Sequence, residues 1–303
     1  MQIYTHDGTF HSDEVFAIAL LKKFINGNVE ITRTRDEFIL KNAKKDKNSF
    51  VIDVGGEYKE KYKNFDHHQR SFNRTWENDN DILLSSCGLV WKYLRKKGYT
   101  KKIDPEVLEV IENDLIKKID MHDNGIRKWP LSSMVSLCNR EESSIEDFEK
   151  AVQVAEIYLD NIFYQEKKNH EKYFDFLNDL EKYDESSRFF ISSHTIKDGR
   201  VLNKISRDTN ALFLIYPQFD DNDIESWMIK SVNRYQDNGE LENAKPPEEW
   251  FGLTGKELFR RSNMKGLLFV HKTGFLMGVK TKNQAIKICD YLVKINTESN
   301  PQI

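Results

Sequence analysis

Histidine and carboxylate side chains gather in three short segments near the start of the chain. Imidazole and carboxylate groups are common protein ligands of divalent metal ions. The candidate residues are His6, His11 and Asp13 in the first segment, Asp53 in the second, and Asp66, His67 and His68 in the third. Each segment alone is also compatible with an ordinary polar loop. Because each follows a predicted strand, the three together indicate one shared metal centre at the edge of a sheet.

Asp53 follows the compact apolar run of residues 49–52 and precedes Gly55 and Gly56. A carboxylate buried at the end of such a strand is costly unless it is paired or bound to a metal ion. At this position it could bridge two metal ions. The alternative is a strand-end carboxylate that only caps the turn at the two glycines.

The pair His67-His68 follows the apolar residue Phe65 and the carboxylate Asp66. Side chains of adjacent residues on an extended segment point to opposite sides, so we expect one imidazole to ligate a metal and the other to face substrate or a residue behind the ligands. Asp66 can orient an imidazole by accepting its second N–H. The alternative is a chance pair of surface histidines.

A fourth cluster contains Asp120 and Asp123, at the end of a predicted helix and just before Asn124 and Gly125. The two carboxylates are three residues apart and therefore lie on one helical face. Either of them could complete a metal shell. The alternative is ordinary helix-terminal chemistry, with the Asn-Gly pair ending the helix.

Mixed imidazole and carboxylate ligands favour two manganese ions, with magnesium or zinc as alternatives. Two metal ions roughly 3.5–4 Å apart can generate hydroxide and clamp a phosphoryl oxygen, which is the chemistry of a phosphoesterase. Other enzyme classes lack their signatures here, because the sequence has no GxSxG, P-loop or GxGxxG motif. Its three cysteines are far apart and form no CxxC pair, which argues against a disulfide framework or a structural zinc site.

The elements that would position these residues follow from the spacing of apolar residues. Strands are predicted at residues 1–5, 29–33, 49–54 and 62–65, and helices at 12–24, 86–97 and 105–121. A capping box at Ser143–Glu146 starts a long amphipathic helix that runs to Tyr183. Further strands are predicted at 188–192, 211–216, 226–231, 266–270 and 275–279, followed by a helix at 286–292. This order predicts two α/β domains, the first with a largely parallel sheet.

A chain of 303 residues exceeds the usual size of a single core. We predict a metal-binding α/β domain at residues 1–130, a helical connector at 131–185 and a C-terminal substrate-binding α/β domain at 186–303. The net charge of −3 argues against binding long nucleic acid mainly through backbone charge. No apolar run approaches the ~18 residues of a membrane span, and no signal-type leader precedes the first strand, so the expected location is the cytoplasm. The oligomeric state stays open, a homodimer included.

Several motifs of this sequence closely resemble those of the MYG exonuclease family. They are His6 with Thr9–Glu14, Asp53–Tyr58, Asp66–Phe72, Ser85–Trp91, Asp123–Ile126, and Phe269–Phe275 with Gly278, Lys280 and Thr281. That family is similar to the DHH phosphoesterases, which include RecJ-like exonucleases and family II pyrophosphatases. The resemblance implies a DHH-phosphoesterase-like fold of two α/β domains joined by a helical middle region, with the active site in the cleft between a metal domain and a substrate domain.

By analogy with these families, Asp53 would bridge the two metal ions and His67 would ligate one of them. His68 would face the scissile phosphate, and we place it with Asp66 in the catalytic set. The first cluster would add His6, His11 and Asp13, although which of the three ligate stays open. The resemblance does not decide between Asp120 and Asp123 either, and we prefer Asp123 as the ligand.

The resemblance implies a metal-dependent 3′–5′ exonuclease that acts on RNA or short oligonucleotides. Residues 265–303 carry six lysines against Asp290 and Glu298, a local excess of positive charge. Candidate substrate-binding residues are Arg70, whose fork can pair two phosphate oxygens, and His271 and Lys280, for which an ordinary solvated surface is the alternative. Two other functions stay open: a small-molecule phosphohydrolase acting on pyrophosphate, a nucleotide or a cyclic dinucleotide, and a non-enzymatic metal-binding protein.

Overall fold

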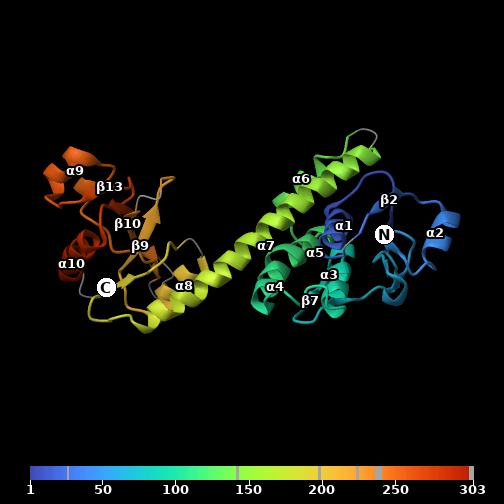
Figure 1. Cartoon of the computed structure of the whole chain (residues 1–303), viewed down its shortest axis with the longest axis horizontal. Helices are drawn as coiled ribbons and strands as arrows, with labels where there is room; N and C mark the ends of the chain where they lie inside the picture. Colours follow the sequence, from blue (N-terminus) through green and yellow to red (C-terminus); the bar gives the residue numbers. More distant parts are fainter. Residues whose placement is uncertain (26, 141–142, 197–198, 223–224, 236–240, 300–303) are drawn as a thin grey trace. The chain divides into compact units, whose positions relative to one another are not determined.

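The computed structural model of the protein describes residues 1–25, 27–140, 143–196, 199–222, 225–235 and 241–299 (Figure 1). Backbone contacts divide the chain into two compact units, Met1–Lys168 and Asn169–Ile303. The long helix α7 (Ile145–Glu181) contributes residues to both. The functional division at residues 130 and 185 stays a prediction, and each compact unit is described by itself.

The first unit is built on a five-stranded sheet with the order β2-β1-β3-β5-β4. Its strands are β1 (Gln2–Thr5), β2 (Glu30–Arg33), β3 (Ser49–Ile52), β4 (Tyr58–Lys59) and β5 (Asn64–Phe65). All neighbours are parallel except β4, which runs antiparallel to β5. The predicted largely parallel sheet is therefore confirmed, although Tyr62, the first residue of the strand predicted at 62–65, belongs to the 3-10 turn η1 (Glu60–Tyr62).

Helices cover both faces of this sheet, which is why its strands read as apolar runs. Ile3 and Phe50 pack on one face against α1 (Ser12–Phe24) and α3 (Ser86–Lys96). Tyr4 and Val51 pack on the other face against α2 (Glu37–Ala43). Figure 1 shows α2 on one side of β1 and β2, and α1 and α3 on the other. In this arrangement the loop after β1 leads directly into the buried start of α1.

The remaining elements of the first unit lie around α1 and α3. They are the hairpin β6 (Thr75–Trp76) and β7 (Asp79–Leu83), helices α4 (Pro105–Ile111), α5 (Lys117–Asp123) and α6 (Pro130–Ser136), and the first part of α7. The single helix predicted at 105–121 is interrupted by a π-helical turn, η2 (Glu112–Ile116). The cap of α7 lies one residue later than predicted, because Ser144 Oγ accepts the N–H of Asp147 at 3.2 Å.

The second unit contains a sheet with the order β13-β14-β10-β9-β8, antiparallel except between β8 and β9. Its strands are β8 (Phe189–Ile191), β9 (Phe213–Phe219), β10 (Glu225–Ser231), β13 (Leu267–Val270) and β14 (Leu276–Val279), with a separate pair β11 (Arg234–Tyr235) and β12 (Leu241–Glu242). Its helices are α8 (Gly199–Asp208), η3 (Glu248–Trp250), α9 (Gly255–Ser262) and α10 (Lys282–Ser299).

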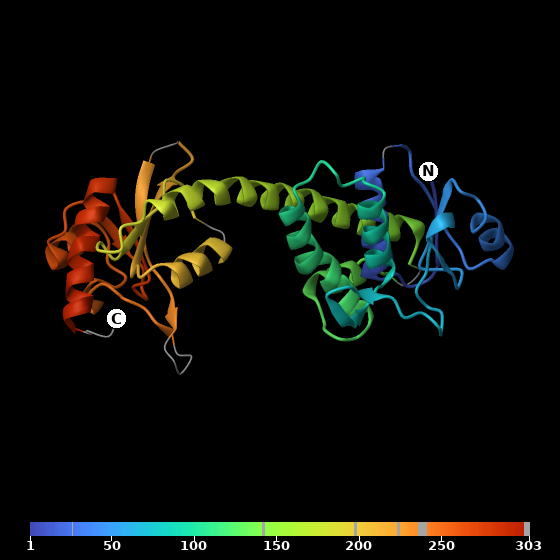
Figure 2. The same ribbon diagram turned by 90° about the horizontal axis from the view of Figure 1, so that it is seen from below.

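Apolar side chains on the two faces of the second sheet pack against different helices. Ile215 and Ile229 contribute to the core with α9 and α10, whereas Leu214 and Met228 pack with α8 and the end of α7. Figure 2 shows α8 and α10 on opposite sides of this sheet. A second α/β unit was predicted and is confirmed. In the part of the chain that the structure describes, no helix combines the length and the apolar character needed to span a membrane.

The carboxylate of Asp120 holds three elements of the first unit together. It is fully buried and accepts hydrogen bonds from Trp76 Nε1 at 2.8 Å and from Gly88 N–H at 3.1 Å. Ser85 donates through its N–H and its hydroxyl, at 3.2 and 2.5 Å. Burial raises the pKa of Asp120 to about 7, although these hydrogen bonds act in the opposite direction. Asp120 thus joins the β6–β7 hairpin, the start of α3 and α5.

Replacing Gly88 with alanine should destabilise the first unit. An added Cβ would lie 2.1 Å from Asp120 Oδ2 and 2.9 Å from Leu84 Cδ2, so the buried carboxylate would have to leave its donors. We expect a loss of roughly 1–3 kcal/mol in the free energy of unfolding, measured with urea. Gly199→Ala is the matched control, because a Cβ there meets nothing within 4 Å. Equal stability of the two variants would contradict the role of Asp120.

Candidate metal centre

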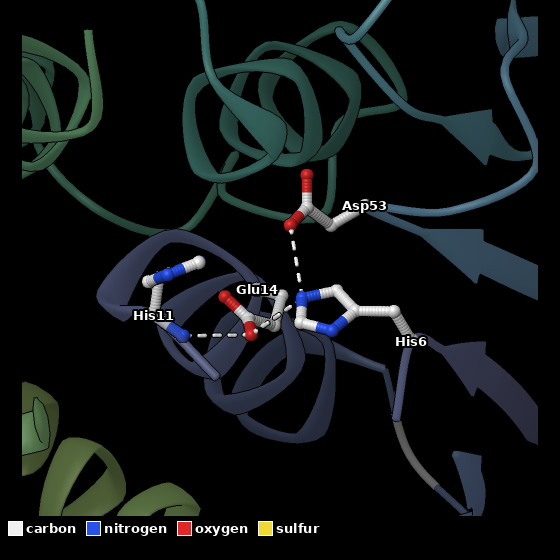
Figure 3. A group of neighbouring side chains, drawn as sticks. All are labelled: His6, His11, Glu14 and Asp53. Carbon is white, nitrogen blue, oxygen red and sulfur yellow. Dashed lines mark hydrogen bonds and ion pairs between the residues drawn. The ribbon is translucent and has the colours of Figure 1, made fainter. Parts of the chain in front are cut away.

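His6 stands in the loop that joins β1 to α1, and only 3% of its surface is exposed. Its Nδ1 lies 2.9 Å from the carbonyl oxygen of Asp7, which can only accept, so Nδ1 carries a proton. Its Nε2 faces two carboxylates, 3.1 Å from Glu14 Oε1 and 3.4 Å from Asp53 Oδ2 (Figure 3). Burial opposes the charged ring, but these carboxylates raise the pKa of His6 to about 10. The two carboxylates therefore favour a positive charge at Nε2, either a proton or a metal ion.

Asp53 directly follows β3 and adopts a left-handed backbone conformation, with a φ of 56°. Such a conformation is unfavourable for a residue with a side chain and persists where the surroundings fix it. Its N–H donates to Phe65 O at 3.1 Å, and Ser86 Oγ donates to its Oδ1 at 2.9 Å. Burial favours the neutral carboxyl, but the imidazoles of His6 and His67 outweigh it and hold the pKa of Asp53 well below its usual range.

Asp13 lies in the first turn of α1 with none of its surface exposed. His67 Nε2 is 3.7 Å from Asp13 Oδ2, 3.3 Å from Asp123 Oδ2 and 3.3 Å from Asp53 Oδ1. Among the described residues, neither oxygen of Asp13 nor His67 Nε2 has a hydrogen-bond partner. Burial raises the pKa of Asp13 well above its ordinary value. Because burying a carboxylate without a partner is costly, these orphaned atoms fit the ligands of a metal ion.

The candidate ligand atoms form three overlapping groups, within each of which they lie no more than 4.8 Å apart. The groups are His6, His11, Glu14 and Asp53; Asp53, His67 and His68; and Asp13, His67 and Asp123. Asp53 links the first two groups and His67 links the last two. All the predicted metal ligands lie in these groups, and their mixed imidazole and carboxylate donors suit manganese, magnesium or zinc. The residues present therefore fit one or two divalent ions.

Glu14 is the residue of this centre that the sequence did not single out. Its side chain is fully buried, Oε1 accepts the N–H of His11 at 2.8 Å, and Oε2 has no hydrogen-bond partner among the described residues. In the structure Glu14 stands three residues after the cap residue His11, which is a common capping position. The apolar run Val15–Leu21 could have indicated that Glu14 is buried. A helix that is apolar on all sides directly after its first turn is surrounded by protein there, and its first turn is then buried as well.

The rings of His67 and His68 do not point to opposite sides, contrary to the prediction. Their centroids are 4.4 Å apart, and both rings approach Asp53 Oδ1. The reason is that the segment after β5 is not a strand, so the alternation of a pleated chain does not apply. Asp66 Oδ1 accepts from both the N–H and Nδ1 of His68, at 3.0 and 2.9 Å, and leaves this ring largely exposed. Asp66 therefore orients His68.

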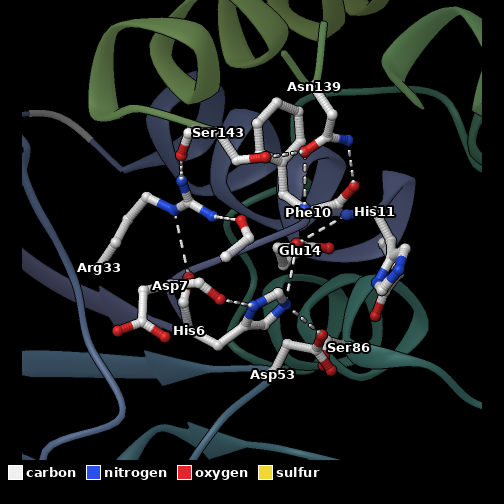
Figure 4. A network of polar contacts seen from close by, with 12 residues as sticks. His6, Asp7, Phe10, His11, Glu14, Arg33, Asp53, Ser86, Asn139 and Ser143 are labelled. Carbon is white, nitrogen blue, oxygen red and sulfur yellow. Dashed lines mark hydrogen bonds and ion pairs between the residues drawn. The ribbon is translucent and has the colours of Figure 1, made fainter. Parts of the chain in front are cut away.

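Arg33, at the end of β2, fixes the loop that carries His6. Its Nε donates to His6 O at 3.1 Å, and its two terminal nitrogens donate to the backbone oxygens of Gly8 and Ser143 (Figure 4). The guanidinium also lies over the ring of Phe148, 4.7 Å from its centroid. Burial lowers the pKa of Arg33, but the group stays charged in any ordinary buffer. One planar side chain thus ties the loop to the segment that precedes α7.

Asn139 fixes the other end of the same loop. Its side chain accepts the N–H of Phe10 at 3.0 Å and donates to Phe10 O at 2.8 Å, as a neighbouring strand would. Ser143 Oγ donates to Asn139 Oδ1 at 3.1 Å and completes the network (Figure 4). The backbone of the loop at residues 6–11, here called the metal loop, is therefore held by side chains from two distant parts of the sequence.

Of the predicted substrate-binding residues, Arg70 belongs to the first unit and His271 and Lys280 to the second. Arg70 is exposed in the turn after His68. His271 follows β13 and Lys280 follows β14, and these strands are antiparallel, so the two residues lie at opposite ends of a hairpin, roughly 13 Å apart along the strands by strand rise. Their binding roles stay predictions.

Comparisons with known proteins agree on one family. The sequence model of the MYG1 exonuclease family, described as an uncharacterised protein family (UPF0160), matches residues 2–293. The MYG1 protein of Chlamydia pneumoniae is 30% identical, with 93% of this chain and 93% of that protein covered. The MYG1 exonuclease of Homo sapiens is 28% identical, with 95% of this chain and 84% of that protein covered.

Solved structures show a weaker likeness. The crystal structure of RecJ from Thermus thermophilus in complex with Mn²⁺ is 11% identical, with a TM-score of 0.31 and 98% of this chain covered. This chain spans about half of that one, with 52% covered. A TM-score this low carries no inference about fold or function.

Asp13→Asn should raise the stability of the metal-free protein and remove its stabilisation by Mn²⁺. The change removes a buried charge without a partner, which we expect to be worth about 1–3 kcal/mol in chelator-treated protein. Because the folded-state pKa of Asp13 is raised, ionisation of this carboxyl destabilises the folded protein as the pH rises towards that pKa. The stability gained by Asp13→Asn should therefore be larger at alkaline pH than at acidic pH.

Thermal unfolding with chelator and with excess Mn²⁺ measures both effects of this substitution. Asp81→Asn, at an exposed carboxylate of the same unit, is the matched control and should leave both curves unchanged. A metal-free Asp13→Asn protein that melts below wild type would contradict the assignment of Asp13 as a ligand.

Arg33→Lys should weaken Mn²⁺ binding by about tenfold, because lysine keeps the charge but cannot reach three backbone oxygens at once. Isothermal titration of chelator-treated protein with Mn²⁺ measures this affinity. The control is Arg35→Lys, an exposed neighbour that pairs only with the side chain of Asp7 among the described residues. Equal affinities in Arg33→Lys and wild type would show that the loop needs no such restraint.

Proposed function

This chain belongs to the MYG1 exonuclease family, and from that membership and its candidate metal centre we propose that it is a metal-dependent phosphodiesterase. The proposed activity is 3′–5′ exonuclease cleavage of RNA or short oligonucleotides. The observation that carries it is the fully buried Asp13 carboxylate, which has no hydrogen-bond partner among the described residues and lies beside His67 and Asp123. The name exonuclease carried by the Homo sapiens relative supports nuclease chemistry.

We assign the candidate ligands to two divalent ions. One would be held by His6, His11 and Asp53, and the other by Asp13, Asp53, His67 and Asp123. When bound, such ions polarise phosphoryl oxygens and lower the pKa of water, which is the chemistry that phosphodiester hydrolysis needs. Manganese is the proposed metal, with magnesium or zinc as alternatives.

His68 and Asp66 are the proposed catalytic residues outside the metal shell. Asp66 holds Nδ1 of His68 at 2.9 Å, so the imidazole presents Nε2 outward from a largely exposed ring. This nitrogen can donate a hydrogen bond to a phosphoryl oxygen of the substrate or pass a proton to the leaving oxygen. Arg70, two residues later, is proposed to hold a neighbouring phosphate through its planar fork.

A small-molecule phosphohydrolase is the second candidate function, and it would use the same metal centre. The observation that favours it is the net charge of −3, because proteins that bind long nucleic acid through its backbone are usually basic. Its substrates would be pyrophosphate, a nucleotide or a cyclic dinucleotide. Under either function, location in the cytoplasm is part of the proposal.

Asp53→Asn should reduce the rate of phosphodiester cleavage by about a thousandfold or more, because the proposed bridging ligand loses one anionic oxygen. The assay is the stepwise shortening of 5′-end-labelled RNA with Mn²⁺, and chelator should abolish it in wild type. Asp160→Asn is the matched control, since among the described residues this exposed carboxylate forms one surface ion pair, with Lys23. A loss of merely twofold in Asp53→Asn would refute the metal assignment.

The same enzyme preparation separates the two candidate substrates. Wild type should release mononucleotides from RNA faster than it releases phosphate from a panel of pyrophosphate, nucleotides and cyclic dinucleotides. The reverse order would favour the small-molecule phosphohydrolase. Inactivity on every substrate in a protein with full metal content would leave a metal-binding protein without catalysis.

A further inference from the structure

A cavity of about 800 Å³ lies in the first unit between the β6–β7 hairpin, α3 and η2. No residue of the three metal-ligand groups lines it. Ligand pockets commonly measure ~300–1,000 Å³, so this one has room for a molecule larger than a phosphate ion. The proposed phosphodiesterase chemistry makes no use of this cavity.

The cavity is more positive than the rest of the chain. Five cationic side chains line it against three carboxylates, whereas the whole chain has a net charge of −3. The cations are Arg74, Lys92, Arg95, Lys96 and Lys117, and the carboxylates are Glu60, Glu77 and Glu112. Arg95 pairs with Glu112 at 2.8 Å and Lys96 pairs with Glu60 at 3.0 Å, so these two cations are already neutralised.

Among the described residues, neither Arg74 nor Lys117 forms an ion pair with a carboxylate, and the ion pair of Lys92 is long. Lys92 and Lys117 lie over the ring of Trp76, 5.1 and 5.4 Å from its centroid, and Arg74 lies 5.9 Å from the centroid of Tyr58. The nearest carboxylate to Lys92 is that of the exposed Glu77, 3.9 Å away. Lys92 Nζ also donates to Thr75 O at 3.2 Å. An anionic ligand in the cavity would give these three cations a charged partner.

The remaining lining groups suit a base or sugar rather than a second charge. Asn73, Asn78 and Asn80 contribute amides that both donate and accept hydrogen bonds, and Tyr58 contributes a half-buried aromatic ring. Amides pair with the edges of nucleobases, and aromatic rings and arginine planes stack on their faces. An anionic ligand with an aromatic, hydrogen-bonding body matches this combination.

We propose that this cavity binds a nucleoside phosphate, with its phosphates on Lys92, Lys117 and Arg74 and its base against the asparagines and Tyr58. The site is separate from the metal centre and does not rest on the proposed catalytic function. Trp76 lines the cavity, and its Nε1 donates a hydrogen bond to the buried carboxylate of Asp120. This hydrogen bond fixes the position of the indole ring.

Fluorescence anisotropy with a methylanthraniloyl-labelled ADP tests this site in the full chain. Chelator and the Asp53→Asn background silence the metal centre, so binding there does not contribute. Saturable binding is expected, and Lys92→Gln/Lys117→Gln should weaken it by at least about tenfold. The matched control is Lys101→Gln/Lys102→Gln, which removes the same charge from exposed lysines outside the cavity and should bind as the background protein does.

Several outcomes would overturn the site. They are the absence of saturable binding, an equal loss in both double variants, and inorganic phosphate displacing the probe as well as ADP does. If Lys92→Gln/Lys117→Gln does not fold, as judged by its melting curve, the exposed Arg74→Gln decides instead. Binding that is unchanged in a folded Arg74→Gln protein would then overturn the proposal.

Discussion

Charge balance among buried carboxylates is the constraint on which the first unit depends. Asp13, Glu14 and Asp53 are each no more than 4% exposed, yet together they carry up to three negative charges. Asp13 and Glu14 lie in the first turn of α1, where the helix dipole supplies an effective positive charge of only about half a unit. Imidazoles supply part of the rest. The fold around these residues has its full stability only when further positive charge is present among them.

The same constraint explains why the surroundings of the centre are so firmly built. The strands β1, β3 and β5 end at one edge of a parallel sheet, and each is followed there by part of the candidate ligand set. Helix α1 is buried from its first residue to Leu21, so its first turn cannot move aside to hydrate the carboxylates. Arg33 and Asn139 hold the connecting loop through its backbone. Groups that would repel one another in a loose structure are thereby kept at ligand distance.

Much of this arrangement could be read from the sequence, because apolar periodicity and residue type are local properties. The strands before His6, Asp53 and Asp66 were predicted, and so was the long helix α7. The sequence could not show in which direction a side chain points. The spacing of Asp120 and Asp123 places both on one helical face, but it does not show that Asp120 is buried and accepts hydrogen bonds from Trp76 and Gly88. The predicted orientation of the two histidines was wrong for a similar reason, because the segment after Phe65 does not pair with a strand and is therefore not pleated.

Contacts that join distant parts of the chain were likewise invisible, and one of them has a consequence for how the protein is made. Phe10 and Asn139 are 129 positions apart, and the hydrogen bonds between them close most of the first unit into one loop. Closing a loop of that length carries a large entropic cost before any contact stabilises it. During synthesis, the metal loop stays without these restraints until the segment that begins α7 has left the ribosome. Residues of this unit that are translated early are therefore among the last to reach their final positions.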